Sequence, residues 1–283
     1  MKVLVTGAGG FSGRHLISHL RADLSAKISC ASVTPRCETG WLFCDMTQKK
    51  AVRDLVRQVM PDQIYHLAGL NTGDYDSDYR VNVLSTKNLL EAIVEGKGRC
   101  RILLVGSSAE YGLVPEEDNP VKEDRALAPM SVYGLTKVYQ TYLMKFYYSF
   151  HNLDVVMARS FNLLGRGAPG NLFIGRVYEQ IEAFQAGRTA KIVVGNLENR
   201  RDYIPIEQAV GYYALIMQRG KPGEIYNVGS GTSIPIRDIL KQILEENGLS
   251  MAIVEESKSE LLHKFDIKNL VADIGKLNKL NTL

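Results

Sequence analysis

The stretch Lys2-Val3-Leu4-Val5-Thr6-Gly7-Ala8-Gly9-Gly10-Phe11-Ser12-Gly13 decides how the rest of the chain is interpreted. Its apolar run predicts a strand, and the residues from Phe11 to position 24 have the period of a helix. Glycines at positions 7, 10 and 13 allow a tight turn, bring backbone N–H groups to a pyrophosphate and let the helix pack on the strand. With a strand before it and a helix after it, the loop predicts dinucleotide binding, with Phe11 and Ser12 included in the site.

The chain up to about residue 160 alternates short apolar runs with segments of helical period. We expect strands at 2–6, 27–33, 63–67, 101–105 and 153–158, and helices at 11–24, 48–59, 78–96 and 131–150. The strands are apolar on both faces, which is typical of a parallel sheet covered by helices on both sides.

The pattern changes after residue 160, where Gly165, Gly167, Pro169 and Gly170 break the regularity. A helix is expected at 171–187 and isolated strands at 192–194 and 225–228. We therefore predict an α/β protein in which a Rossmann doubly wound parallel sheet occupies residues 1–160. A smaller C-terminal α/β substrate lobe occupies 161–283, with some chain crossing back to the Rossmann domain.

Composition excludes several classes of protein. The net charge is +3, from 34 basic and 31 acidic residues, and the basic residues are scattered, so no nucleic-acid surface is indicated. No apolar run is long enough to span a bilayer and no signal-peptide pattern is present, so we expect a soluble cytoplasmic protein without a membrane partner. The cysteines at 30, 37, 44 and 100 lack a zinc-ligand spacing, and we interpret them as reduced thiols without a metal.

The end of the expected second strand bears on cofactor choice. NAD-selective sites have an acidic residue there that binds the ribose 2′-hydroxyl, but residues 29–36 contain no acid. Arg36, with Arg14 as a second candidate, favours a 2′-phosphate, so NADP(H) is predicted and NAD(H) is less expected. The alternative is that both arginines are solvated surface residues.

Two further segments fit the same cofactor. Asp45, followed by Met46, would bring a carboxylate to the adenine, although Asp45 could equally cap the helix 48–59. Leu67, Ala68 and Gly69 would end the strand 63–67 beside the cofactor.

Tyr133 and Lys137 are four residues apart on an expected helix, so their side chains share one face. A phenol has an unperturbed pKa of about 10, and an ammonium beside it lowers that pKa by favouring the phenolate. Tyr133 would then be a general acid or base. This pair is common by chance in helices, but together with the glycine loop and the Ser-rich end of strand 101–105 it predicts a catalytic site.

With these motifs the chain resembles the extended short-chain dehydrogenase/reductase family, in particular its sugar-nucleotide members, over nearly its whole length. The resemblance implies that Ser107, with Ser108 as the alternative, hydrogen-bonds the sugar carbonyl, that Tyr133 passes the proton, and that Lys137 holds the nicotinamide ribose. Asn82 matches a family asparagine beside the active site, although it could be polar surface of the helix 78–96.

Similarity to the same family also implies a homodimer through helices 78–96 and 131–150. The apolar residues that could form the interface, or could instead all belong to the monomer core, are Leu84, Leu89, Leu143, Phe146 and Tyr147.

The segment 195–203, Gly-Asn-Leu-Glu-Asn-Arg-Arg-Asp-Tyr, is similar to a segment of enzymes that act on GDP-mannose derivatives. Arg201 can hold a diphosphate with its fork of donors, and Glu198 can accept from guanine N–H groups. The alternative for Arg201 is a surface ion pair with Asp202 or with another neighbour. Asn162 resembles the family asparagine that contacts substrate phosphate. The expected substrate site also contains Ser108, Asn171, Arg176 and Asn196.

Within the family the resemblance is closest to the GDP-4-keto-6-deoxy-D-mannose reductases, through the motif at 106–112 and Pro129-Met130-Ser131. Related dehydratases have a carboxylate two residues before Tyr111, where this chain has Ala109. A methyl group cannot be a base, and Glu110 would point to the opposite side of an extended segment.

The expected function is therefore NADPH-dependent reduction of the C4 ketone of a GDP-4-keto-6-deoxy sugar, hexose or heptose, in deoxysugar nucleotide biosynthesis. An alternative is a sugar-nucleotide C4 epimerase or 4,6-dehydratase with tightly bound NAD(P). A cofactor-sensing binding protein is the non-enzyme alternative, since fold alone does not determine function, but such a protein has no use for the Ser-Tyr-Lys set.

Overall fold

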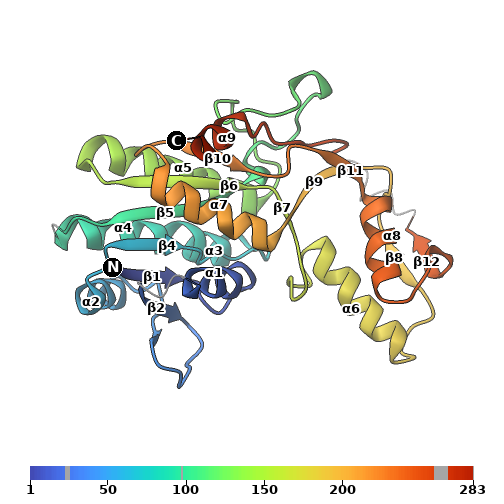
Figure 1. Cartoon of the computed structure of the whole chain (residues 1–283), viewed down its shortest axis with the longest axis horizontal. Coiled ribbons are helices and arrows are strands. Elements are labelled where there is room, and N and C mark those ends of the chain that lie inside the picture. The colour runs from blue at the N-terminus through green and yellow to red at the C-terminus, as the bar shows by residue number, and fades with distance from the viewer. Residues whose placement is uncertain (23–25, 97, 258–266, 283) are drawn as a thin grey trace.

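The computed structural model describes residues 1–22, 26–96, 98–257 and 267–282. Within them, the larger of two units contains a seven-stranded sheet of order β10-β6-β5-β4-β1-β2-β3, in which every neighbouring pair is parallel (Figure 1). The predicted α/β fold with a doubly wound parallel sheet is confirmed. The strands are β1 (Lys2–Thr6), β2 (Lys27–Ser32), β3 (Trp41–Phe43), β4 (Gln63–His66), β5 (Arg101–Ser107), β6 (Val155–Ser160) and β10 (Ile225–Val228).

Helices cover both faces of this sheet because its strands alternate their side chains between two apolar cores. Leu4 and Ile64 belong to one core, and Val3 and Tyr65 to the other. The first core includes residues of α2 (Lys49–Val59), α4 (Ser85–Gly96) and α5 (Val132–His151); the second includes residues of α1 (Phe11–Arg21), α7 (Ile206–Arg219) and α9 (Gly275–Asn281).

The strand order reverses beside β1. The chain runs from β1 outward through β2 to β3 and then crosses to β4 on the other side of β1. The connections leave the carboxyl ends of β1 and β4 in opposite directions, and this opens the crevice in which such sheets bind their ligands. Thr6 and His66 are the last residues of these two strands.

The small lobe, on the right of Figure 1, has an apolar core of its own. Ile174, Ile181, Ile192, Ile239 and Ile243 are buried in it. Its elements are α6 (Phe173–Gln185), β8 (Ile192–Val194), α8 (Ile236–Glu246) and β12 (Val254–Glu256), and β12 pairs with β8. A three-stranded sheet of β7 (Asn162–Leu164), β9 (Arg200–Pro205) and β11 (Ser233–Pro235) lies between the two units (Figure 1).

We expected an isolated strand at 225–228 in the second lobe, and this is wrong. The strand β10 pairs with β6 in the main sheet, with Ile225 opposite Met157. All four of its residues are buried, and α7 and α9 pack on the same unit. An apolar run indicates a strand but not the sheet that it joins, because that choice depends on the path of the chain between the units.

The predicted helix 78–96 is interrupted at its start. Helix α3 (Tyr75–Tyr79) passes into a π-helical turn, η1 (Arg80–Leu84), before α4 begins. The remaining short elements are the 3₁₀ turns η2 (Ser108–Glu110), η3 (Glu116–Asp118) and η4 (Met251–Ile253). No helix in the described part of the chain has both the length and the apolar character needed to cross a membrane.

The predicted interface residues divide between core and surface. Leu89 and Tyr147 are buried in the first core, as the monomer-core alternative expected for them, and Leu143 packs against the same core. Phe146 is exposed on α5. The helix turns once in 3.6 residues, so only part of an apolar helix reaches solvent.

Candidate active site

The glycine loop joins β1 to α1 with very close backbone contacts. Gly7 has φ +65°, and a Cβ there would lie 2.6 Å from the backbone N of Ala68 and from the carbonyl carbon of Leu67. A Cβ on Gly13 would lie 2.4 Å from the carbonyl oxygen of Gly7. Only glycine fits at these two positions, so the predicted loop brings together β1, α1 and the end of β4.

Helix α1 begins at Phe11, and its N-cap residue Gly10 supplies no side-chain cap. The first turn, which contains Phe11, Ser12 and Gly13, has no acidic residue. N–H groups of a first helical turn have no intrahelical acceptor, and the helix dipole is positive there. This end of α1 therefore fits a dinucleotide pyrophosphate.

The segment after β2 brings Arg36 to the glycine loop. A Cβ on Gly9 would lie 3.3 Å from Oγ of Ser32 and 3.7 Å from Nη2 of Arg36. The Arg36 guanidinium also lies 4.3 Å from the centroid of the Trp41 ring. A cation and a hydroxyl thus lie beside the glycine loop.

Asp45 is not the cap of the helix 48–59, which was its alternative role, because the N-cap residue of α2 is Gln48 and no side chain caps this helix. The Oδ1 atom of Asp45 accepts from the Thr47 N–H at 2.9 Å and from the Thr47 hydroxyl at 2.8 Å, just before α2 begins. The neighbouring Met46 is buried. After β4, Gly69 lies beside the catalytic region, since a Cβ there would be 3.6 Å from Nζ of Lys137.

Ser107, Tyr133 and Lys137 come together where β5 ends. Ser107 is the last residue of β5, and its hydroxyl is hydrogen-bonded to Tyr133. Nζ of Lys137 lies 5.7 Å from the centroid of the Tyr133 ring and donates to the carbonyl of Val105 at 2.9 Å. The structure thus unites three residues that the sequence analysis took from two separate motifs. Ser108, the alternative hydroxyl, is buried in the turn that follows.

The start of α5 explains how the two motifs meet. The side chain of Ser131 caps the helix by accepting from the Gly134 N–H at 3.0 Å. A Cβ on Gly134 would lie 2.6 Å from the carbonyl oxygen of Ala109. This close packing places the first turn of α5, with Tyr133, directly against the turn that follows Ser107.

The pKa values of the pair differ from the expectation. Burial raises the pKa of Tyr133 to about 12, although its hydrogen bond with Ser107 works in the opposite direction. Burial lowers the pKa of Lys137 to about 8, opposed by the charge of Glu110. The prediction that Lys137 lowers the pKa of Tyr133 is therefore wrong, because burial is the largest cause of the shift and Lys137 is not among the groups that lower this pKa. Near neutral pH, Tyr133 holds its proton and Lys137 is mainly charged.

Glu110 is buried and accepts hydrogen bonds from three other residues, a role that the sequence analysis did not predict. Its Oε1 accepts from the Ser107 N–H at 2.8 Å, and its Oε2 accepts from Thr141 at 2.6 Å and from Arg159 at 2.9 Å. Arg159 also donates to the hydroxyl of Tyr111 at 2.9 Å. Glu110 and Arg159 are 0% and 1% exposed, so the pair is fully desolvated. An arginine inside an apolar strand was the available signal, since a buried cation requires an anion.

Asn82 is buried in the π turn η1, which excludes the polar-surface alternative. Its amide donates to the Leu70 carbonyl and to Thr136, both at 2.8 Å, and its oxygen accepts from the Leu70 N–H at 2.8 Å. The side chain therefore ties the segment after β4 to the first turns of α5. A π turn often marks a functional site.

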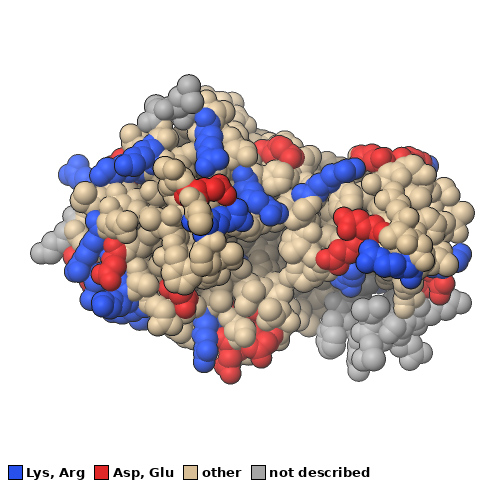
Figure 2. Space-filling model, turned by 90° about the horizontal axis from the view of Figure 1, so that it is seen from below, with Lys and Arg blue, Asp and Glu red and all other residues tan. Residues whose placement is uncertain are grey.

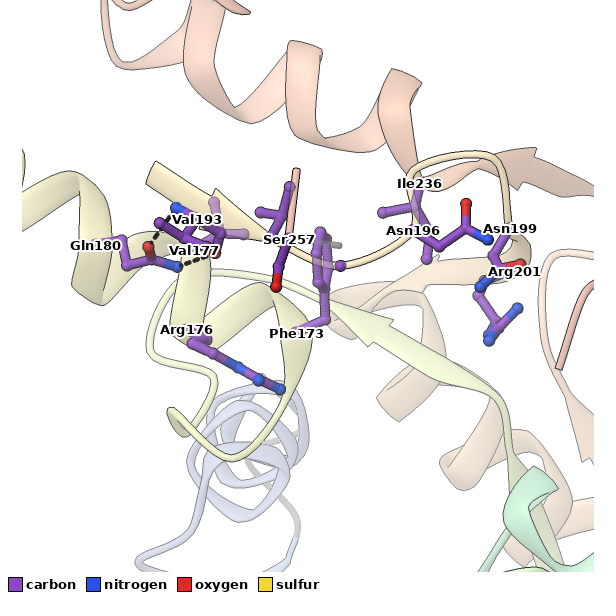
Figure 3. A pocket seen from close by; sticks show the side chains of 12 residues that line it. Phe173, Arg176, Val177, Gln180, Val193, Asn196, Asn199, Arg201, Ile236 and Ser257 are labelled. Atoms are coloured by element: carbon purple, nitrogen blue, oxygen red, sulfur yellow. Dashed lines mark hydrogen bonds between the residues drawn. The ribbon is translucent and has the colours of Figure 1, made fainter. Parts of the chain in front are cut away.

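The small lobe contains a pocket of about 370 Å³, with lining residues from α6, β8, β9 and α8. In Figure 3, Arg176 extends from α6 below Phe173, and Arg201 lies at the other side of the pocket beyond Asn199. Gln180 is fixed to the backbone of Val193 by two hydrogen bonds, at 2.7 and 3.0 Å. The wall thus combines an aromatic ring, amides and two arginines. Ser107, Tyr133 and Lys137 do not line this pocket.

Other predicted substrate residues lie in different surroundings. Asn196 lines the pocket and accepts from the Glu198 N–H at 2.9 Å. The carboxylate of Glu198 is exposed and binds Arg237 at 2.6 Å, and Glu198 is not among the residues that line the pocket. Asn162 donates to the carbonyl of Asp202 at 3.1 Å, between β7 and β9.

Asp202 does not bind Arg201, so it is not the partner of the surface ion pair that was the alternative role of Arg201. Asp202 is buried, and its carboxylate accepts from Ser230, Gly231 and Ala272. The guanidinium of Arg201 donates to the carbonyl of Ile267 and lines the pocket.

Asn171 and Arg14 each form a hydrogen bond between the two units. Asn171 donates to the carbonyl of Asn71 at 2.8 Å. Arg14, the second candidate for a ribose phosphate, instead donates to the carbonyl of Gly167 at 3.5 Å, so it faces the lobe side. Figure 2 shows the surface hollowed between the units, with basic side chains on both sides of the hollow.

Several known proteins are similar to this chain over most of its length. GDP-6-deoxy-D-mannose reductase of Pseudomonas aeruginosa is 26% identical over 267 residues, covering 90% of this chain and 83% of that protein. GDP-6-deoxy-D-talose 4-dehydrogenase of Aggregatibacter actinomycetemcomitans is 28% identical over 288 residues, covering 100% and 91%. RMD of Pseudomonas aeruginosa, solved in complex with NADPH, superimposes with a TM-score of 0.84 at 23% identity, covering 99% of this chain and 91% of that one.

Residues 3–229 match the family model described as the NAD dependent epimerase/dehydratase family. This range contains the glycine loop, Ser107, Tyr133 and Lys137, together with most of the main sheet. The chain therefore belongs to the NAD dependent epimerase/dehydratase family.

Proposed function

We propose that this chain uses NADPH to reduce the C4 ketone of a GDP-4-keto-6-deoxy sugar, a hexose or a heptose. The observation that carries the reaction type is the interaction of Tyr133 with Ser107 at the end of β5, in a turn whose position 109 is alanine. The similarity to GDP-6-deoxy-D-mannose reductase and to GDP-6-deoxy-D-talose 4-dehydrogenase supports the substrate class.

Reduction of a ketone needs one hydride and one proton. The dinucleotide, when bound, supplies the hydride. Ser107 would donate a hydrogen bond to the C4 oxygen, and Tyr133 would transfer its hydroxyl proton to that oxygen as negative charge develops. Lys137, held by Val105 and Gln140, would bind the cofactor ribose through one of its N–H groups.

Dehydration needs a base that removes the C5 proton, and the site favours reduction in this respect. Ala109 offers no carboxylate, and the adjacent Glu110 is held beneath the site by Ser107, Thr141 and Arg159. Both of its carboxylate oxygens already accept these buried hydrogen bonds and are directed away from the substrate side. Glu110 is therefore unsuited to replace the missing base.

The choice of NADPH rests on the surroundings of Arg36. This cation, Ser32 and the backbone of Gly9 lie close together beside the glycine loop. A guanidinium binds a phosphate with two parallel hydrogen bonds, whereas a 2′-hydroxyl would normally be bound by a carboxylate. Residues 29–36 contain no carboxylate.

The nucleotide part of the substrate would occupy the pocket of the small lobe. Phe173 can stack on a purine, and Arg176 and Arg201 can bind a diphosphate. Glu198, which binds Arg237, would have to leave that ion pair to read guanine, so amide and backbone groups of the pocket are better placed for this.

We further infer a homodimer formed through α5. Tyr142, Phe146 and Phe150 are 60%, 47% and 74% exposed on this helix, and the rings of Phe146 and Phe150 stack at 4.9 Å. A second copy with the same face would bury these rings. Light scattering should give twice the mass of the chain, and Phe146→Glu should shift the protein towards monomer; a monomeric wild type would contradict the inference.

The test of the function offers purified protein two substrates. GDP-mannose should remain unchanged, whereas GDP-4-keto-6-deoxy-mannose or its heptose analogue should be consumed with one NADPH oxidised for each ketone, and NMR would identify the product. Formation of a 4-keto-6-deoxy product from GDP-mannose without net use of NADPH would contradict the proposal and favour a dehydratase.

A further inference from the structure

A continuous set of buried polar side chains runs from the glycine loop to the catalytic lysine. Its members come from β1, β4, α4 and α5. Thr6 contacts Nδ1 of His66 at 2.8 Å, Nε2 of His66 contacts Thr86 at 3.1 Å, and Gln140 donates to the same Thr86 hydroxyl at 2.8 Å. Nζ of Lys137 then donates to Oε1 of Gln140 at 3.1 Å. His66, Thr86, Gln140 and Thr6 are each at most 1% exposed.

Donor and acceptor roles in this set follow from the chemistry of its ends. An ammonium only donates, so the oxygen of the Gln140 amide faces Lys137 and its NH₂ group faces Thr86. The Thr86 hydroxyl donates its single proton to the Asn82 carbonyl at 2.7 Å, so it accepts from both other neighbours. His66 therefore carries its proton on Nε2. Burial and the charge of Lys137 lower the pKa of His66 to about 3, which keeps it neutral.

We propose that Gln140 is a positioning residue for Lys137, and that Thr86 and His66 hold its amide in the required orientation. The proposal rests on the proposed function, in which Lys137 takes part in the reaction. Gln140 lies three residues after Lys137 on α5, so the helix alone places the two side chains as neighbours. What the helix does not determine is which end of the amide faces the ammonium, and Thr86 decides this.

The acceptor that Gln140 offers to Lys137 is uncharged, and this affects the pKa of the lysine. Val105 and Gln140 both offer an uncharged oxygen to Nζ, so they hold the ammonium in place without adding an anion. The titratable groups nearest to Lys137 are Tyr133 on α5, Glu110 after β5 and His66 on β4. Glu110 is paired with Arg159 of β6, and Asp78 of α3 acts on Tyr133.

Two substitutions at position 140 should act in opposite directions. Gln140→Glu places an anion beside the ammonium and should raise the pKa of Lys137 by about one unit or more. Gln140→Met removes the acceptor and should lower that pKa, with kcat reduced roughly tenfold because Lys137 loses its position. The alkaline limb of the pH profile of kcat should shift in the same direction as the pKa of Lys137 in each variant.

The experiment measures the pKa of Lys137 directly on the full chain with NADP⁺ added. Protein labelled with ¹³C at the lysine ε-carbon is titrated by NMR, and Lys137→Arg identifies the signal. Gln208→Glu is the matched control, since Gln208 is exposed on α7 and contacts Tyr212. It should leave the signal unchanged.

Opposite shifts in the two Gln140 variants would support the proposal. Lower Tm with an unchanged Lys137 pKa in both would overturn it and leave Gln140 a purely structural role. Should either variant fail to fold, Thr86→Val replaces it in the test. This variant keeps Gln140 but removes the hydroxyl that orients its amide, so the pKa of Lys137 should again fall. The NMR titration needs no sugar substrate, so failure of GDP-4-keto-6-deoxy-mannose to react would sink the proposed function without affecting this result.

Discussion

The large unit and the small lobe use polar side chains in opposite ways. Around Ser107, Tyr133 and Lys137 the polar groups are buried and bonded to one another, as in the pair of Glu110 and Arg159 at 0% and 1% exposed. In the small lobe Glu198 and Arg237 form their ion pair at 74% and 47% exposed. Buried dipoles keep a fixed orientation without competition from water, so the first arrangement suits chemistry and the second suits adaptable recognition.

Loss of one buried charge should give the largest effect. Glu110→Ala leaves the guanidinium of Arg159 without its anion, and removal of one partner of a buried ion pair costs about 3–5 kcal/mol of unfolding free energy. Denaturant unfolding at neutral pH measures this. Glu198→Ala is the matched control, because exposed ion pairs contribute little. Equal losses in the two variants would remove the distinction between the two regions.

The second-largest effect is expected from removing the proton donor, which should change turnover but not stability. Tyr133→Phe deletes one hydroxyl, so the fold and cofactor binding should persist while kcat falls roughly 100-fold or more, the usual scale for a positioned acid. Steady-state turnover and a separate titration of NADPH would measure both quantities. Turnover close to that of the wild type would exclude Tyr133 as the proton donor and would break the link between burial and catalysis in the large unit.

The smallest effect is expected from a charge at the rim of the large unit. Arg36 lies beside the glycine loop with its guanidinium over Trp41. Arg36→Ala should reduce the preference for NADPH over NADH by roughly tenfold, the scale of one charge-assisted hydrogen bond, and leave kcat with NADH unchanged. Values of kcat/KM with both cofactors provide the measurement. A wild type that prefers NADH would contradict the choice of cofactor, and an unchanged preference in the variant would move the role away from Arg36.

Several features were predictable because they depend on neighbours in the chain. Alternating strands and helices indicated the doubly wound sheet, and the four-residue separation of Tyr133 and Lys137 places them on one face of α5. The ends of elements were less accurate, as the π turn at Arg80–Leu84 illustrates. It forms where Asn82 bonds to Leu70, a contact that no local pattern announces.

What the sequence by itself determined is the set of local geometries: the glycine intervals of the first loop, the pairing of Tyr133 with Lys137, and the absence of a carboxylate at Ala109. Only the tertiary structure decided which distant groups meet these residues. Glu110 binds Arg159, which lies 49 positions further along the chain, and Gln140 binds Thr86, which lies 54 positions before it. Such pairs depend on how strands and helices pack, and the pKa values of Tyr133 and Lys137 follow the burial that this packing produces.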